Sequence, residues 1–206
     1  MIKTYLSFLV VVLNTFIVLF AQQSRGFPYK NPTLPVETRV ADLLSRMTLE
    51  EKVGQLLCPL GWEMYKIKGN DVLPSDKFKQ LIKDRNAGML WATYRADPWT
   101  KKTLATGLNP ALAAKAGNAL QKYVMENTRL GIPLFLAEEA PHGHMAIGTT
   151  VFPTGIGMAA TWSPQLINEV GEAIGKEIRL QGGHISYGPV LDLARDPRWS
   201  RVEETF

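Results

Sequence analysis

Short apolar runs separated by helical patterns are the feature of this sequence that most restricts its fold. Residues 88–92 read Gly-Met-Leu-Trp-Ala, residues 131–137 read Gly-Ile-Pro-Leu-Phe-Leu-Ala, and a third strand-like run spans 185–193. Strands that are apolar on both faces belong inside a parallel sheet that helices cover on both sides. The sequence therefore predicts an α/β fold. Its 206 residues, 46% hydrophobic and 20% charged, suit one domain or part of one.

The helices between these runs are predicted from apolar side chains that recur every three to four residues. Their starts carry recognisable signals, namely a Thr48-Leu49-Glu50-Glu51 capping box and the pairs Asn109-Pro110 and Ser163-Pro164, with proline at the first helical position. Helices are expected over 36–47, from 49 to about 57, over 76–83, from 110 onward and over 164–180. Residues 22–35 contain three prolines and no period, which predicts an extended lead-in to residues 36–206.

The N-terminus predicts a signal peptide over residues 1–21. Lys3 precedes an apolar stretch from about Leu6 to Phe20, and Ala21 offers a small residue at the expected cleavage point. A membrane anchor is the alternative, but about fifteen apolar residues are short for a span that needs about twenty. We expect a secreted or periplasmic protein with no stable membrane anchor after leader removal.

Charge and cysteine content narrow the function further. Lysine plus arginine number 23 against 19 acidic residues, a formal charge of +4 without a basic run, so nothing points to nucleic acid as a partner. Cys58 is the only cysteine, which excludes a disulfide within this chain.

Two polar clusters follow directly after two of the predicted strands. Glu138-Glu139-Ala140-Pro141-His142-Gly143-His144 comes after the run ending at 137, and residues 194–201 follow the run ending at 193. Ligands of parallel α/β folds bind beyond the carboxyl ends of the strands. The two clusters are therefore the predicted walls of a binding site.

At these residues the chain resembles a known family. Six blocks, at 39–55, 129–134, 139–143, 151–153, 160–162 and 196–201, occur in the order in which they stand in the N-terminal part of glycoside hydrolase family 3, the β-glucosidase and β-xylosidase group. The resemblance implies an incomplete (β/α)₈ TIM-barrel-like domain, about its first half, that an α/β sandwich follows in the family.

The resemblance also assigns residues to the substrate, an oligosaccharide or glycoside. Glu139 and Arg201 correspond to family residues that hydrogen-bond hydroxyls of the terminal non-reducing sugar. His142 and Trp199 are further candidates for the pocket wall. A carboxylate accepts from two adjacent hydroxyls and a guanidinium donates in a planar fork, which suits recognition of hydroxyl stereochemistry.

No catalytic residue is expected in this chain. By resemblance, the nucleophilic Asp and the acid/base Glu lie beyond the equivalent of Phe206, so the chain would be the first part of a longer retaining β-glycosidase that needs no cofactor. Glu138 and Glu139 cannot serve as the catalytic pair, because neighbouring residues of a strand point to opposite faces.

Two other functions stay open. The chain could be a secreted sugar-binding remnant that keeps Glu139 and Arg201 without catalytic activity. His142 and His144 could instead begin the metal site of an amidohydrolase-like barrel. Against the metal site, the remaining histidine, His184, precedes its strand and should lie at the opposite end of the sheet, so we expect no metal.

Overall fold

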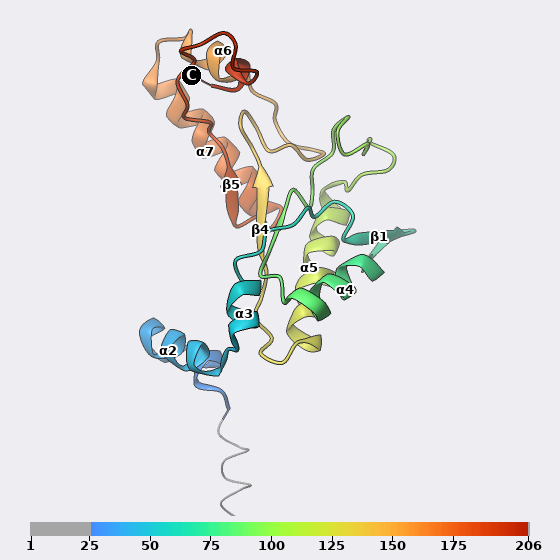
Figure 1. Ribbon diagram of the computed structural model, residues 1–206. Coiled ribbons are helices and arrows are strands. Elements are labelled where there is room, and N and C mark those ends of the chain that lie inside the picture. Colours follow the sequence, from blue (N-terminus) through green and yellow to red (C-terminus); the bar gives the residue numbers. More distant parts are fainter. Residues whose placement is uncertain (1–25, 206) are drawn as a thin grey trace, which may run out of the picture. The chain divides into compact units, whose positions relative to one another are not determined.

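The computed structural model describes residues 26–205 (Figure 1). The chain divides into two compact units, with the boundary between Thr48 and Leu49. The predicted signal peptide lies outside the described residues. No helix within residues 26–205 is long and apolar enough to cross a membrane.

The first unit contains a 3₁₀ turn, η1 (Pro28–Lys30), and the predicted helix, α2 (Val36–Arg46). The Asp42 carboxylate links them, because it accepts from the Tyr29 amide at 3.1 Å and pairs with Arg46 at 2.8 Å. Arg39 Nε also donates to the Tyr29 carbonyl at 3.0 Å. The predicted lead-in is thus extended only in part, since residues 28–30 form the turn that these bonds hold against α2.

A parallel sheet forms the centre of the second unit. Its strands are β3 (Met89–Trp91), β4 (Phe135–Glu139) and β5 (Ile185–Tyr187), in the order β3-β4-β5. Residues 57–61 continue the sheet beside β3, because the Met89 and Trp91 amides donate to the carbonyls of Leu57 and Pro59. This arrangement confirms the predicted parallel sheet.

The helices of this unit are α3 (Leu49–Gly54), α4 (Asp76–Arg85), α5 (Pro110–Asn127), the short α6 (Gly155–Ala159) and α7 (Pro164–Leu180). Four of them were predicted, although α3 ends at Gly54 and not near 57, and α6 was not predicted. Ser75, Asn109 and Ser163 cap three of them, each accepting from the amide three residues ahead. An antiparallel hairpin of β1 (Tyr65–Lys68) and β2 (Asp71–Pro74), unpredicted, precedes α4.

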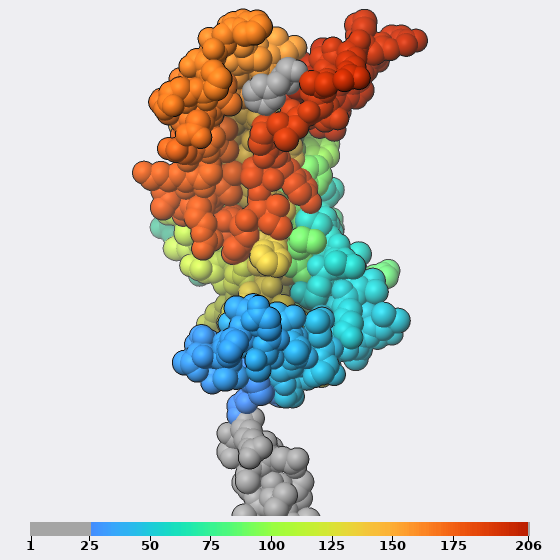
Figure 2. Space-filling view, turned by 90° about the vertical axis from the view of Figure 1, so that its left-hand side faces the viewer, coloured from blue at the N-terminus to red at the C-terminus, as the bar shows by residue number. Residues whose placement is uncertain are grey.

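Two strand boundaries differ from the prediction. β4 continues through Glu138 and Glu139, which were expected to follow it. β5 ends at Tyr187 and not at 193, because Gly188 has φ +154° and Pro189 has no N–H for the ladder. Beyond β5 the chain runs as a loop to the turn η2 (Val202–Glu204), which contacts α6. In Figure 2 this red segment lies beside the orange surface around α6.

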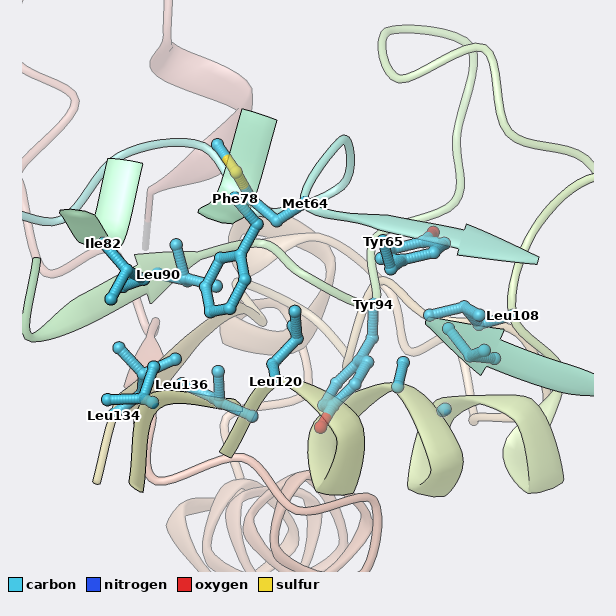
Figure 3. Packing of buried hydrophobic residues seen from close by; sticks show 14 of the residues in the cluster. Met64, Tyr65, Phe78, Ile82, Leu90, Tyr94, Leu108, Leu120, Leu134 and Leu136 are labelled. Carbon is cyan, nitrogen blue, oxygen red and sulfur yellow. The ribbon is translucent and has the colours of Figure 1, made fainter. Parts of the chain in front are cut away.

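The core of this unit lies where α4, α5 and the hairpin cover one face of β3 and β4 (Figure 3). Phe78, Leu90, Leu120 and Leu136 are buried, and the Phe78 and Tyr123 rings meet edge to face at 5.7 Å. The small side chains that α5 turns inward let its backbone pack closely against the hairpin. These are Ala113 and Ala116, whereas Gly117 faces the Tyr94 hydroxyl. The core therefore holds the carboxyl ends of β3 and β4 at fixed positions.

Candidate functional site

A cavity of about 790 Å³ lies at the carboxyl ends of the strands. The last residues of β3, β4 and β5, which are Trp91, Glu139 and Tyr187, form part of its wall. The loops beyond these strands supply the other polar side chains of the wall, namely Arg95, His142, Thr154, Asp192, Arg201, Glu203 and Glu204. The structure thus brings together three of the four candidate residues. Trp199, the fourth, is half-buried and does not line the cavity.

Glu139, the last residue of β4, contributes a carboxylate to the cavity wall. Its Oε2 accepts from the Trp91 indole N–H at 2.9 Å and lies 3.6 Å from Arg95 Nη1. Its Oε1 accepts no hydrogen bond within residues 26–205. Burial raises the pKa of Glu139, while the charge of Arg95 and the Trp91 hydrogen bond act in the opposite direction. One oxygen is thus held by the protein and the other is left for a ligand.

Arg95 is a cavity residue that the sequence analysis missed. Its Nε and Nη2 both lie 2.7 Å from Asp97 Oδ2, and its guanidinium stacks 4.6 Å above the Trp99 ring. Burial works to raise the pKa of Asp97, but hydrogen bonds from Thr100 and Arg95 outweigh burial and lower it. This Arg–Asp pair is therefore ionised beside Glu139.

Arg201 lines the cavity and is paired with the carboxylate of Glu204. Its Nε donates to Glu204 Oε1 at 2.8 Å, and its Nη2 pairs with Glu204 Oε2. The hydrogen bonds that Arg201 donates to Glu204 raise the pKa of Arg201, and the charges of Glu139 and Asp192 add to this effect. Arg201 thus lies in the field of Glu139 but makes no direct bond to it, and its side chain remains 57% exposed.

The two histidines of the candidate metal motif face different partners. His142 Nδ1 lies 3.0 Å from the Phe152 carbonyl, which can only accept, so this nitrogen carries the proton. His144 is buried with Nε2 at 3.5 Å from Glu138 Oε2. Among the described residues, no group of three or more His, Cys, Asp or Glu side chains could hold a metal ion. The geometry gives no support to an amidohydrolase-like metal site.

Glu138 lies beneath the site and not in it. It is fully buried, and its two oxygens accept from the amides of Thr93 and Tyr94 at 3.0 and 3.2 Å. Burial raises the pKa of Glu138, against the effect of His144. Glu138 and Glu139 therefore occupy opposite faces of β4, as the strand geometry predicts. Asp196 and Arg198 form an ion pair on the surface, where the Arg198 side chain is 89% exposed.

Parallel strands alternating with helices, with a charged cavity at the carboxyl ends of the strands, are typical of (β/α)₈ barrels, and residues 49–205 supply part of such a barrel. The sequence pattern of the Glycosyl hydrolase family 3 N terminal domain matches residues 48–206. The chain belongs to glycosyl hydrolase family 3.

The chain is similar in sequence to proteins named as beta-xylosidases and beta-glucosidases. A putative beta-xylosidase of Formosa agariphila is 36% identical over 205 residues, which cover 99% of this chain and 26% of the relative. The periplasmic beta-glucosidase of Salmonella typhimurium is 31% identical over 182 residues, covering 86% of this chain and 20% of the relative. This chain thus spans about a quarter of the length of these relatives or less.

Solved structures resemble this one in fold. A β-glucosidase from Erythrobacter marinus matches with a TM-score of 0.64 and 31% identity over 87% of this chain and 22% of its own. An exo-1,3/1,4-beta-glucanase from a Pseudoalteromonas species matches with a TM-score of 0.63 and 28% identity, over 87% of this chain and 27% of its own.

Proposed function

We propose that the whole protein is a β-glycosidase that removes terminal non-reducing glucose or xylose from oligosaccharides or glycosides. One observation carries the proposal. Glu139 and Arg201, which the family's motifs assign to the sugar hydroxyls, line the same cavity at the carboxyl ends of the strands. The names of relatives, beta-xylosidase and beta-glucosidase, agree with it.

The cavity suits a sugar ring in its chemistry. Glu139 Oε1 accepts nothing from the described residues and can accept from a hydroxyl, while the Arg201 guanidinium can donate to one. His142 has Nδ1 occupied by a carbonyl, which leaves Nε2 to accept. Donors and acceptors on different walls can select the orientation of adjacent hydroxyls, because an unmatched buried partner costs binding free energy.

The proposed mechanism is double displacement with retention. A carboxylate attacks the anomeric carbon and a second carboxyl protonates the leaving oxygen, the two standing about 5–5.5 Å apart. Both are expected outside residues 1–206. Glu138 cannot be one of them, since two backbone amides hold its carboxylate under the sheet. The role of this chain in the reaction is to bind and orient the sugar.

Turnover and stereochemistry test this proposal together. The whole protein should hydrolyse 4-nitrophenyl β-glucoside or β-xyloside, and proton NMR of the first product should show the β-anomer. Residues 22–206 alone should show no turnover. The α-anomer as first product would contradict retention. Absence of turnover with retained binding of glucose or xylose would favour the sugar-binding remnant.

We also propose that the protein is exported. The apolar N-terminal stretch after Lys3 supports this, and two relatives are named as periplasmic enzymes. Sequencing of the mature N-terminus should find cleavage after Ala21. A chain that retains Met1 in the membrane fraction would contradict cleavage.

A further inference from the structure

Arg95 enters the cavity with its guanidinium fixed on two sides. The Nε and Nη2 atoms of Arg95 each lie 2.7 Å from Asp97 Oδ2. The centre of the Trp99 ring lies 4.6 Å from the guanidinium carbon. The Arg95 side chain is only 14% exposed. A planar guanidinium with one edge bound and one face stacked has little freedom, so its remaining nitrogen has a defined place.

The backbone that carries Arg95 is fixed as well. The amides of Thr93 and Tyr94 donate to the buried carboxylate of Glu138, at 3.0 and 3.2 Å. Hydrogen bonds to a buried carboxyl oxygen are strong because the local dielectric constant is low. Because Glu138 directly precedes Glu139 on β4, the strand that presents Glu139 also anchors the loop that presents Arg95.

The remaining nitrogen, Nη1, lies 3.6 Å from Glu139 Oε2. The same oxygen accepts from the Trp91 indole N–H at 2.9 Å. We propose that Arg95 is a positioning residue for Glu139: with Trp91 it holds Oε2, opposes protonation of the carboxylate and leaves Oε1 to accept from the sugar. This inference rests on the proposed function, and it adds a residue from the loop after β3 to the sugar site.

Several neighbouring groups influence the pKa of Glu139, and Arg95 is one of those that lower it. Burial and the negative charge of Glu204 raise the pKa of Glu139, whereas Arg95, the Trp91 hydrogen bond and Arg201 lower it. Tyr187, another titratable neighbour, is a neutral phenol whose own pKa is raised. His142, Asp192 and Glu203 also line the cavity. Arg201 is already paired with Glu204. Arg95 is therefore the main cation that opposes the effect of burial on Glu139.

Kinetics of the whole protein test this role through two substitutions. Arg95→Met removes the charge and Arg95→Lys keeps it without the planar fork. We expect kcat/KM for 4-nitrophenyl β-glucoside to fall about 10- to 100-fold in Arg95→Met, as expected for a misplaced binding group, and by less in Arg95→Lys. Arg129→Met is the matched control, because Arg129 pairs with Glu51 and does not line the cavity.

A titration measured on Trp91 gives a second result that does not depend on activity. In protein labelled with 5-fluorotryptophan, the Trp91 resonance, assigned with Trp91→Phe, should follow protonation of Glu139 through their hydrogen bond. The midpoint should move to higher pH in Arg95→Met and stay near the wild-type midpoint in Arg95→Lys and Arg129→Met. An inactive wild-type protein would contradict the proposed function. The Trp91 titration would still test whether Arg95 acts on Glu139.

Two outcomes would overturn the inference. One is an unchanged Trp91 titration midpoint in Arg95→Met. The other is equal loss of kcat/KM in Arg95→Met and Arg95→Lys with a lowered melting temperature and no change in pH dependence, which would assign Arg95 a purely structural role.

Discussion

The indole N–H of Trp91 donates to Glu139 Oε2 at 2.9 Å, joining the last residue of β3 to the last residue of β4. The two residues are 48 positions apart in the sequence and meet only because their strands are neighbours in a parallel sheet. The bond therefore reports directly on the geometry of the sugar site.

Loss of this donor should weaken catalysis by the whole protein. Trp91→Phe keeps an aromatic ring but removes the N–H, and a hydrogen bond to a charged group contributes about 1.5–3 kcal/mol. We expect kcat/KM to fall about tenfold or more in steady-state kinetics. Trp162→Phe serves as the control, because Trp162 is 92% exposed. Equal activity of the two variants would show that the bond does not matter for the site.

Gly54 should resist substitution for a reason of space. A Cβ at this position would stand 2.3 Å from the Arg85 carbonyl oxygen and 2.6 Å from that of Asn86, both backbone atoms at the end of α4. Gly54→Ala should therefore destabilise the protein by about 1–3 kcal/mol, as overpacking does. Lys52→Ala, at an exposed position of the same helix, is the control. Thermal unfolding of the two variants makes the comparison, and equal melting temperatures would refute the close packing of α3 on α4.

Asp97 should stabilise the fold in a manner that depends on pH. Its pKa in the folded protein lies below the ordinary value of 3.8, so its contribution is complete near neutral pH and is lost as the pH falls through the lowered pKa. Asp97→Asn should lower the free energy of unfolding by about 1.5–3 kcal/mol at neutral pH.

Urea denaturation at several pH values measures this contribution. The difference between wild type and Asp97→Asn should shrink in the acidic range, and Asp84→Asn, at an exposed position of α4, should change stability less. A difference that grows toward acidic pH would contradict the direction of the Asp97 shift.

Local signals predicted much of this fold. Asn109-Pro110 and Ser163-Pro164 mark the starts of α5 and α7, because the capping side chain and the proline act on the residues next to them. The apolar runs located β3 and β4. The predicted end of β5 at 193 was wrong, because the prediction followed hydrophobicity past Gly188 and Pro189. These two residues interrupt the hydrogen bonds between β5 and its neighbour.

The site was predictable only in part. The family resemblance assigned Glu139 and Arg201 to the substrate and added His142 as a candidate for the pocket wall, and all three line the cavity. Arg95 was missed, although the rule that placed sites after strands applies equally to the run at 88–92 and would have led to residues 93–97. Its contacts with Glu139 and Trp99 involve no periodic pattern, so only the packed structure reveals them.

The central claim is that Glu139 and Arg201 hold the terminal sugar, and kcat/KM of the whole protein for aryl β-glycosides tests it most directly. Glu139→Gln and Arg201→Ala should each lose about 2–4 kcal/mol of transition-state binding, or about 30- to 1000-fold, because each leaves a polar partner unpaired. Arg198→Ala, which removes an exposed arginine of the same segment, should match the wild type. Unchanged kcat/KM in both Glu139→Gln and Arg201→Ala would contradict the claim and remove these residues from the site.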